Sequence, residues 1–217
     1  ALTPLLEPVA IDIDVAANRV FVVDAGLQAL IAINLTSGER TIVSDNNPPN
    51  NSNLFVTPVE LAFDVANNRV LVVDIGTAML YAVNIADGSR TILSDFTPMG
   101  GLMGPVAING IDIDTINSRA LVTHGDLDAL IGVDLTTGVQ TVISDAATPN
   151  AINSFDFPSD IVFDAANNRA LVRDGVLSAY IAVNLTSGAR TIFSDANVPN
   201  DITPFASTGE LALDSAQ

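Results

Sequence analysis

The chain has 217 residues, of which 48% are hydrophobic, so it can bury a sizeable core and is not expected to be disordered. Its basic residues are eight arginines against 25 acidic residues, and the net charge of −17 argues against nucleic acid as a partner. Asp, Asn or Arg interrupts every apolar run, so no membrane insertion is expected. The lack of cysteine excludes disulfides and thiolate metal sites.

A unit of 50 residues repeats along the chain without gaps. Its first copy contains β-like runs at 9–14, 19–24, 30–35 and 39–45, each bounded by a turn signal. Asp14 stands where its carboxylate can accept backbone N–H bonds of a turn, and Gly38 stands where a turn needs positive φ. Arg19 follows the Asp14 turn in every copy and is predicted to form a repeated ion pair there. A long Asn- and Pro-rich segment then leads to the next copy.

Four short antiparallel strands and one long connection per unit are typical of a β-propeller blade. Leucine-rich and parallel β-helix repeats are shorter, and no segment shows the 3.6-residue period of a helix. The predicted fold class is therefore an all-β propeller of four-stranded blades, with four complete blades and the first strand of a fifth. One repeat domain, 1–217, divides into the end of a preceding loop at 1–8, blades at 9–58, 59–108, 109–158 and 159–208, and the fifth-blade strand at 209–217.

The stretch 64–95, DVANNRVLVVDIGTAMLYAVNIADGSRTILSD, resembles the repeats of NHL-type and YWTD-type propellers. Those repeats have an Asp, a short turn, an apolar β run ending in Asp, a further strand and a Gly turn. All four copies share this likeness, although the chain has no Trp and its β runs read VFVVD, VLVVD, ALVTH and ALVRD. The resemblance implies a propeller fold of the six-bladed superfamily and no particular activity, because such propellers include hydrolases, receptors and scaffolds.

Six-bladed lactonases of the regucalcin and gluconolactonase kind look similar in topology. In that group, carboxylates and Asn at the beginnings of the inner strands hold a divalent metal. The resemblance carries this role to Glu60, Asp160 and Glu210. The metal-binding Asn and the catalytic dyad of that group have no counterpart here.

The first strand of each copy also supplies acidic residues in two layers, which are expected to line a central channel. Each copy has one acidic residue in one of the two layers and never two. Oxygen ligands, with no Cys and a single His, favour Ca²⁺ over Zn²⁺. The alternative is a water-filled channel whose acidic walls are only solvated. The candidate metal ligands are Glu60, Asp160, Glu210, Asp12 and Asp112.

Two residues depart from the repeat at positions where a ligand could bind. His124, the only histidine, replaces the Asp of the other copies and is expected on the same face as Glu60 and Asp160. It is the one candidate catalytic base, with Asp126 or Asp128 to orient it, or else a bland substitution. Arg173 places a cation in an apolar run, where it forms an ion pair or binds an anionic ligand group.

Three functions remain open. The first is a non-catalytic, exported propeller, extracellular, periplasmic or at the cell surface, that presents its long Asn/Pro-rich loops to a protein or glycan. The second is a Ca²⁺-dependent, lactonase-like hydrolase that uses the channel carboxylates. The third is a fragment of a larger propeller that forms a homo-oligomer, or associates with missing blades, through exposed blade faces.

Overall fold

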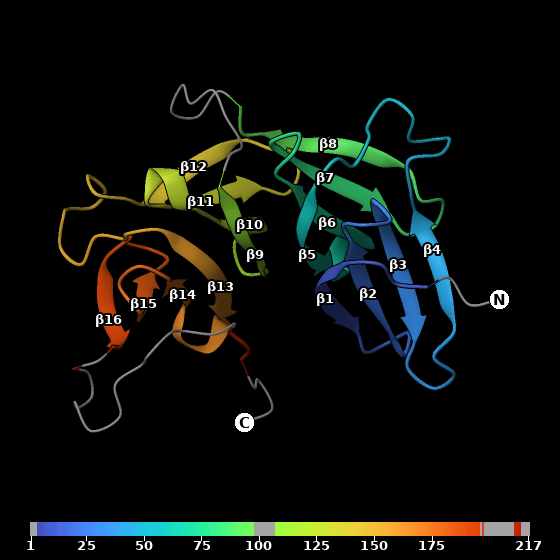
Figure 1. Cartoon of the computed structure of the whole chain (residues 1–217). Coiled ribbons are helices and arrows are strands. Elements are labelled where there is room, and N and C mark those ends of the chain that lie inside the picture. Colours follow the sequence, from blue (N-terminus) through green and yellow to red (C-terminus); the bar gives the residue numbers. More distant parts are fainter. Residues whose placement is uncertain (1–3, 98–106, 196, 198–210, 214–217) are drawn as a thin grey trace. The chain divides into compact units, whose positions relative to one another are not determined.

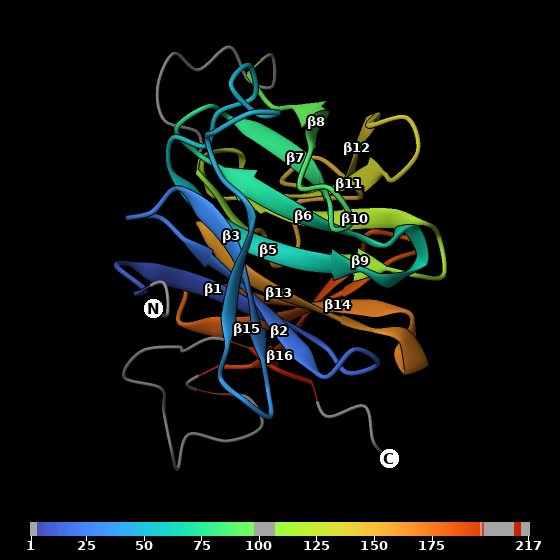
Figure 2. The ribbon, with the colours of Figure 1, turned by 90° about the vertical axis from the view of Figure 1, so that its right-hand side faces the viewer.

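The computed structural model describes residues 4–97, 107–195, 197 and 211–213, and four antiparallel sheets of four strands each make up its fold. Figure 1 shows these sheets, and Figure 2 shows the same strands after a quarter turn. In each sheet the strands are hydrogen-bonded in chain order. The expected architecture is confirmed: each sheet is a propeller blade of a 50-residue repeat.

Blade 1 shows how the sequence sets the strands. Its β2, Arg19–Asp24, matches the predicted run in both bounds, and its other strands lie within one residue of their predicted ends. Proline opens β1 and does not occur inside the strands that follow it in this blade, in agreement with the ladder's need for N–H donors. The strands of blade 1 are β1 (Pro8–Asp14), β2 (Arg19–Asp24), β3 (Ala29–Asn34) and β4 (Arg40–Ser44).

The other three blades repeat this plan. Blade 2 consists of β5 (Pro58–Asp64), β6 (Arg69–Asp74), β7 (Met79–Asn84) and β8 (Arg90–Asp95). Blade 3 consists of β9 (Ile108–Asp114), β10 (Arg119–His124), β11 (Ala129–Asp134) and β12 (Gln140–Ser144). Blade 4 consists of β13 (Pro158–Asp164), β14 (Arg169–Asp174), β15 (Ala179–Asn184) and β16 (Arg190–Ser194). Of the predicted fifth-blade strand, only residues 211–213 are described, and they have no assigned strand.

A buried aspartate organises the first turn of every blade. In blade 2, Asp64 accepts the backbone N–H of Asn67 and forms an ion pair of 2.8 Å with Arg69. The same pair recurs in the other blades at 2.7–2.9 Å, which confirms the predicted series. The carboxylate is buried while its arginine is partly exposed, so the pair fixes the turn and contributes modestly to stability. Gly38 takes the expected positive φ of 69° in the later turn.

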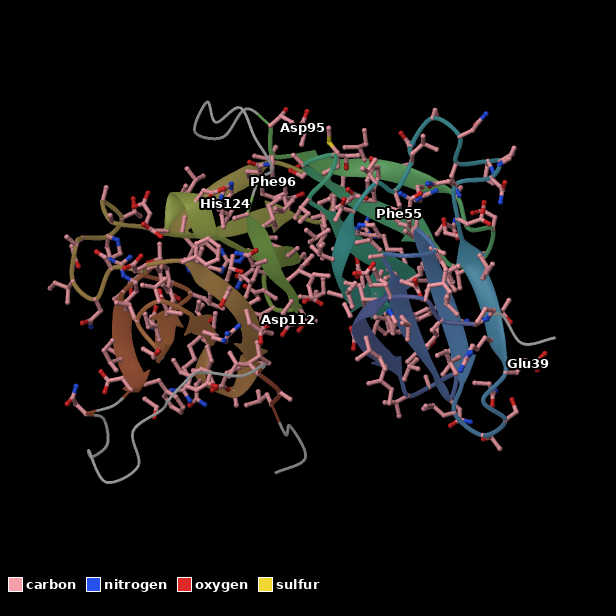
Figure 3. All side chains as sticks on the ribbon, in the orientation of Figure 1. Glu39, Phe55, Asp95, Phe96, Asp112 and His124 are labelled. Carbon is pink, nitrogen blue, oxygen red and sulfur yellow. The ribbon has the colours of Figure 1, made fainter. Side chains whose placement is uncertain are left out.

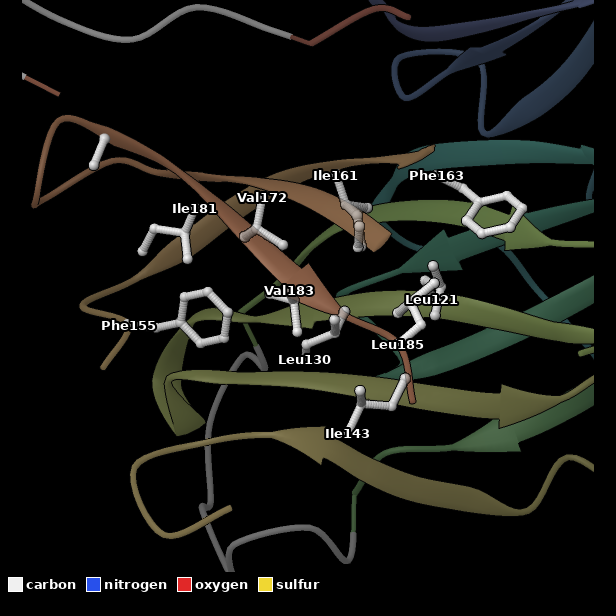
Figure 4. Packing of buried hydrophobic residues seen from close by; sticks show 12 residues of the cluster. Leu121, Leu130, Ile143, Phe155, Ile161, Phe163, Val172, Ile181, Val183 and Leu185 are labelled. Carbon is white, nitrogen blue, oxygen red and sulfur yellow. The ribbon is translucent and has the colours of Figure 1, made fainter. Parts of the chain in front are cut away.

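The chain divides into two compact units, Ala1–Val106 and Ala107–Gln217, and each holds two blades. In the first unit, Phe21 of blade 1 packs on Phe63 of blade 2 with ring centroids 5.2 Å apart. In the second unit, Leu121 and Phe163 take the same places in the buried cluster, which Figure 4 shows from close by. The two cores therefore correspond at an interval of 100 residues: Phe55 to Phe155, Leu61 to Ile161, Val72 to Val172 and Val83 to Val183.

Candidate functional site

The predicted metal ligands Asp12 and Asp112 lie on the first strands of blades 1 and 3, where they connect neighbouring blades. Oδ2 of Asp12 accepts the backbone N–H of Phe63, 51 residues later, at 2.7 Å. Oδ2 of Asp112 accepts the N–H of Phe163 at 2.6 Å in the same register. In both residues Oδ1 accepts the N–H of the next residue in the chain. Both oxygens of each carboxylate thus already accept hydrogen bonds from the backbone.

Glu60 and Asp160 belong to the other layer. Asp160 makes the same pair of bonds, from Ile161 and from Leu211, each at 2.7 Å. Glu60 accepts the N–H of Leu61 at 3.1 Å, and both acidic side chains are partly buried. Glu210 lies outside the described residues. Asp12 and Asp112 therefore connect neighbouring blades, whereas Asp160 holds the segment 211–213.

The calcium hypothesis stays a prediction. Asp12 and Glu60 belong to the first unit, and Asp112 and Asp160 to the second. Within the described part of the chain, no three acidic or histidine side chains form a group that could hold a metal ion. Hard-cation sites need six or more oxygen ligands, so the backbone-bonded carboxylates would need further ligands.

His124 is the most unusual of the predicted site residues. It lies at the end of β10 and is 0% exposed, and Figure 3 labels it together with Asp112 of the same blade. Burial lowers the pKa of its imidazole, and the charge of Asp126 opposes part of that shift. A fully buried, neutral imidazole is an accessible base only if the site opens. Its catalytic role remains a prediction.

The other blades show what His124 replaces. Asp74, also 0% exposed, accepts the N–H groups of Val56 and Thr57 from the connection that precedes its blade, at 2.7 and 3.1 Å. Asp24 and Asp174 bond in the same way, and burial raises the pKa of Asp174 while backbone N–H groups oppose the shift. In blade 3 this acceptor has moved two residues along the chain, because Asp126 accepts the N–H of Ala107 at 3.0 Å. Asp126 thus anchors this connection in blade 3, where His124 takes the place of the aspartate.

Arg173 lies directly opposite Asp160 in the pairing of β13 with β14. The pairing register is constant from Asp164 opposite Arg169 to Asp160 opposite Arg173, and the β-bulge between Pro158 and Asp160 lies beyond it, so Asp160 shares a face with Arg173. The face expected for His124 therefore needs correction, because strand alternation places position 174, its equivalent in blade 4, on the other side. The structure brings Asp160 and Arg173 together on one face and does not place the His124 position on it.

Sequence reasoning missed a pair of buried arginines that hold the long connections. Arg90 is 4% exposed, its guanidinium lies 3.8 Å over the ring of Phe55, and it donates to the backbone oxygen of Asp45 and to Asn46. Arg190, also 4% exposed, donates to carbonyl oxygens of residues 145–153. Burial lowers the pKa of Arg90 to about 10, which leaves it charged at neutral pH. The available signal was the 100-residue interval between Phe55–Arg90 and Phe155–Arg190.

The comparisons with known proteins indicate the fold alone. None of the helices in the described part of the chain has the length and apolar character needed to cross a membrane. No protein-family model matches the sequence. No curated protein matches it either.

Solved structures, by contrast, match the chain with TM-scores above 0.6 and identities of 15% or less. A chain of a nidogen–laminin complex matches with a TM-score of 0.69 at 15% identity, over 86% of this chain and 64% of that one. A protein of unknown function from Bacteroides thetaiotaomicron gives 0.65 at 14%, over 90% and 45%. Streptogramin B lyase gives 0.63 at 12%, over 86% and 54%. The chain thus spans between 45% and 64% of these structures. At such low identity the likeness shows a β-propeller fold and no activity.

Proposed function

We propose that the chain is a non-catalytic, exported propeller module that binds a partner protein through the connections 45–57 and 145–157. One observation carries the proposal: these connections are held firmly in place and yet expose large apolar side chains. The first exposes Leu54 by 42% and Val56 by 47%. The second exposes Ile152 by 65% and Phe157 by 41%. Ordered loops on a rigid scaffold commonly carry binding residues.

Hydrogen bonds define the backbone of the first connection. The side chain of Asn46 bonds both the N–H and the carbonyl oxygen of Phe55, at 2.8 Å each. Asn53 donates to the carbonyl oxygen of Arg90 at 2.9 Å, while Phe55, labelled in Figure 3, is 1% exposed. Because the loop is already ordered, a partner would not lose the free energy of ordering it.

The second connection is held in an equivalent way. Asn153 donates to the carbonyl oxygen of Arg190 at 3.1 Å, and Phe155 is 4% exposed. The exposed apolar side chains of each connection favour a protein over a glycan, since apolar contacts supply much of the affinity of protein interfaces. The acidic, lysine-free composition supports export, and the similar chain from a nidogen–laminin complex supports a protein partner.

A screen of the full chain against secreted proteins and a glycan array tests the proposal. The screen is repeated with the double variant Leu54→Ser/Val56→Ser, and with Val65→Ser as the matched control. Val65 is 72% exposed on the 3₁₀ turn after β5, outside the long connections. We expect a protein that loses at least about tenfold in affinity for the double variant and none for the control. If a glycan shows this pattern instead, the partner is a glycan and not a protein. If the screen finds no ligand whose binding the double variant weakens, the proposal is refuted.

The calcium-dependent hydrolase is the alternative, and the structurally similar lyase keeps it open. Because Asp12 and Asp112 already accept two backbone hydrogen bonds each, we expect millimolar calcium to leave the melting temperature unchanged. Calorimetry with calcium and with a chelator measures this. A rise in melting temperature that Glu60→Ala and Asp160→Ala abolish would establish the metal site.

A further inference from the structure

The first-strand face of blade 1 is exposed where the corresponding faces of blades 2 and 4 are buried. Val9 is 40% exposed, Ile11 66% and Ile13 49%. At the corresponding positions Leu61 is 4% exposed, Ile161 5% and Phe163 8%, and Phe63 is partly buried. We call this surface of blade 1, with Ile11, Ile13 and Gly38, the incoming face. Three large apolar side chains in one strand form a typical contact surface.

The turn between β3 and β4 completes this face. In blade 2, Gly88 lies against the preceding blade: a Cβ there would collide with the carbonyl oxygen of Val43, and Ser44 donates to the Gly88 oxygen at 2.7 Å. Ser144 donates to the oxygen of Gly188 at 2.8 Å in blade 4. Among the described residues, no atom other than those of its chain neighbours lies within 4 Å of the Cβ position of Gly38.

The complementary, outgoing face belongs to blade 4 and is exposed only in part, since Leu171 on it is 6% exposed. Phe193 is 46% exposed, whereas Ile143, at the same position of blade 3, is 8% exposed inside the core of the second unit. Asp160 on this face bonds a backbone N–H 51 residues later, and Ser194 takes the position of Ser44 and Ser144. Leu171 takes the position of Phe21, which packs on Phe63 in the first unit.

The repeat register joins the two faces. The serine-to-glycine bond spans 44 residues in both units. Counted on from Ser194, and with four repeats of 50 subtracted, this interval leads to the position of Gly38. The aspartate bond spans 51 residues, so Asp160 points to position 211, which is Ile11 by the same subtraction. We propose that the incoming face of blade 1 binds the outgoing face of blade 4 in a second copy of this chain, head to tail.

The segment 211–213 holds part of this site within each chain. Leu211 donates its N–H to Asp160 at 2.7 Å, and Leu211 and Leu213 stand in phase with Ile11 and Ile13. Association therefore replaces the segment 211–213 of the same chain with the first strand of a partner. Because the segment 211–213 competes with the partner's first strand for the outgoing face, the association between chains is weakened. High salt should strengthen it, because salt screens the repulsion between two chains that each carry a net charge of −17.

Sedimentation equilibrium of the full chain, over a roughly hundred-fold range of concentration, tests the proposal. We expect a mass that rises with concentration and with salt. Ile11→Asp should weaken association at least about tenfold, while Val15→Asp, at a 76% exposed position in the turn after β1, should leave it unchanged. Leu211→Pro removes the N–H that Asp160 accepts and should strengthen association. Circular dichroism checks the fold, and Ile13→Ser replaces Ile11→Asp if that variant unfolds.

A cross-link identifies the faces, since the natural chain has no cysteine. Chains with Ile13→Cys are mixed with chains carrying Leu171→Cys under mild oxidation. We expect disulfide-linked dimers containing one chain of each kind in clear excess over dimers of either kind alone. A constant monomer mass for both the natural chain and Leu211→Pro would overturn the proposal, as would equal losses for Ile11→Asp and Val15→Asp or a cross-link without preference for the mixed pair.

Discussion

Asp24, Asp74 and Asp174 show how much a single buried carboxylate fixes in this protein. Each accepts backbone N–H groups both from its own hairpin and from the connection before its blade. Position 124 lacks this group, and Asp126 supplies the acceptor for the connection in its place. The histidine therefore brings an imidazole in place of the carboxylate, and burial lowers the pKa of that imidazole.

The titration of His124 gives a prediction. Its folded-state pKa is lowered, whereas the unfolded chain binds a proton near the ordinary value of about 6.5. The unfolded state then holds more protons in the window below about 6.5, so the free energy of unfolding should decrease as the pH falls through that window. Urea unfolding between about pH 7 and pH 5 measures the decrease.

The matched control is His124→Gln, which keeps a polar side chain and cannot titrate. Its stability should change less with pH over the same window than that of the natural chain. An equal dependence on pH in both proteins would show that other groups cause the decrease. The buried Asp174 is not one of them, because its raised pKa in the folded state makes the free energy of unfolding increase as the pH falls.

At the scale of elements, the long connections depend on a strand of the following blade. Arg90 begins β8, and its guanidinium holds the connection that leaves β4. A buried cation with backbone acceptors is costly to remove, because the acceptors lose their partner inside the protein. The connection between blades 1 and 2 is therefore part of the folded core.

Replacement of Arg90 tests this dependence. Arg90→Met keeps the apolar contact with Phe55 and removes the donors, and we expect a loss of about 3 kcal/mol in the free energy of unfolding. Proteolysis in residues 45–57 should become faster. Thr91→Ala, at an exposed neighbour in the same strand, is the control and should have little effect. An unchanged cleavage rate in Arg90→Met would show that the guanidinium of Arg90 does not hold this connection.

At the scale of the whole molecule, stability depends on how neighbouring blades are joined within each unit. An inner bond from Asp12 to Phe63 and an outer bond from Ser44 to Gly88 join blades 1 and 2 on either side of their shared core. Asp112 and Ser144 do the same for blades 3 and 4. In a repeat protein, such contacts between neighbours set how cooperatively the units unfold.

Removal of both bonds should separate the unfolding of the two blades. For Asp12→Ala/Ser44→Ala we expect a loss of about 2–4 kcal/mol and faster hydrogen exchange in blade 1 than in blade 2. Ser37→Ala, in an exposed turn of blade 1, serves as the control. Uniform exchange across both blades would mean that apolar packing alone couples them.

The blades could be predicted from the sequence because every local signal agreed: strand alternation, the Asp14 turn and Gly38 all recur at one interval. The site could not be predicted in the same way. The sequence of a first strand is the same whether its carboxylate binds a metal or accepts the N–H of another blade. Only the packing of blade 1 against blade 2 shows that Asp12 accepts the N–H of Phe63. The bulge between Pro158 and Asp160, which sets the pairing of position 174, leaves no mark in the sequence pattern.

The correspondence of the two cores at 100 residues has a consequence for the ancestry of the chain. Phe63 and Phe163 match each other while Ile13 and Ile113 form a second pair, although arginine stands at positions 40, 90 and 190 alike. The alternation of Ile and Phe is the pattern that duplication of a pair of blades would leave. Duplication of two blades, 100 residues, keeps the contact between the two different kinds of blade. Duplication of one blade, 50 residues, would instead create a contact between two blades of the same kind.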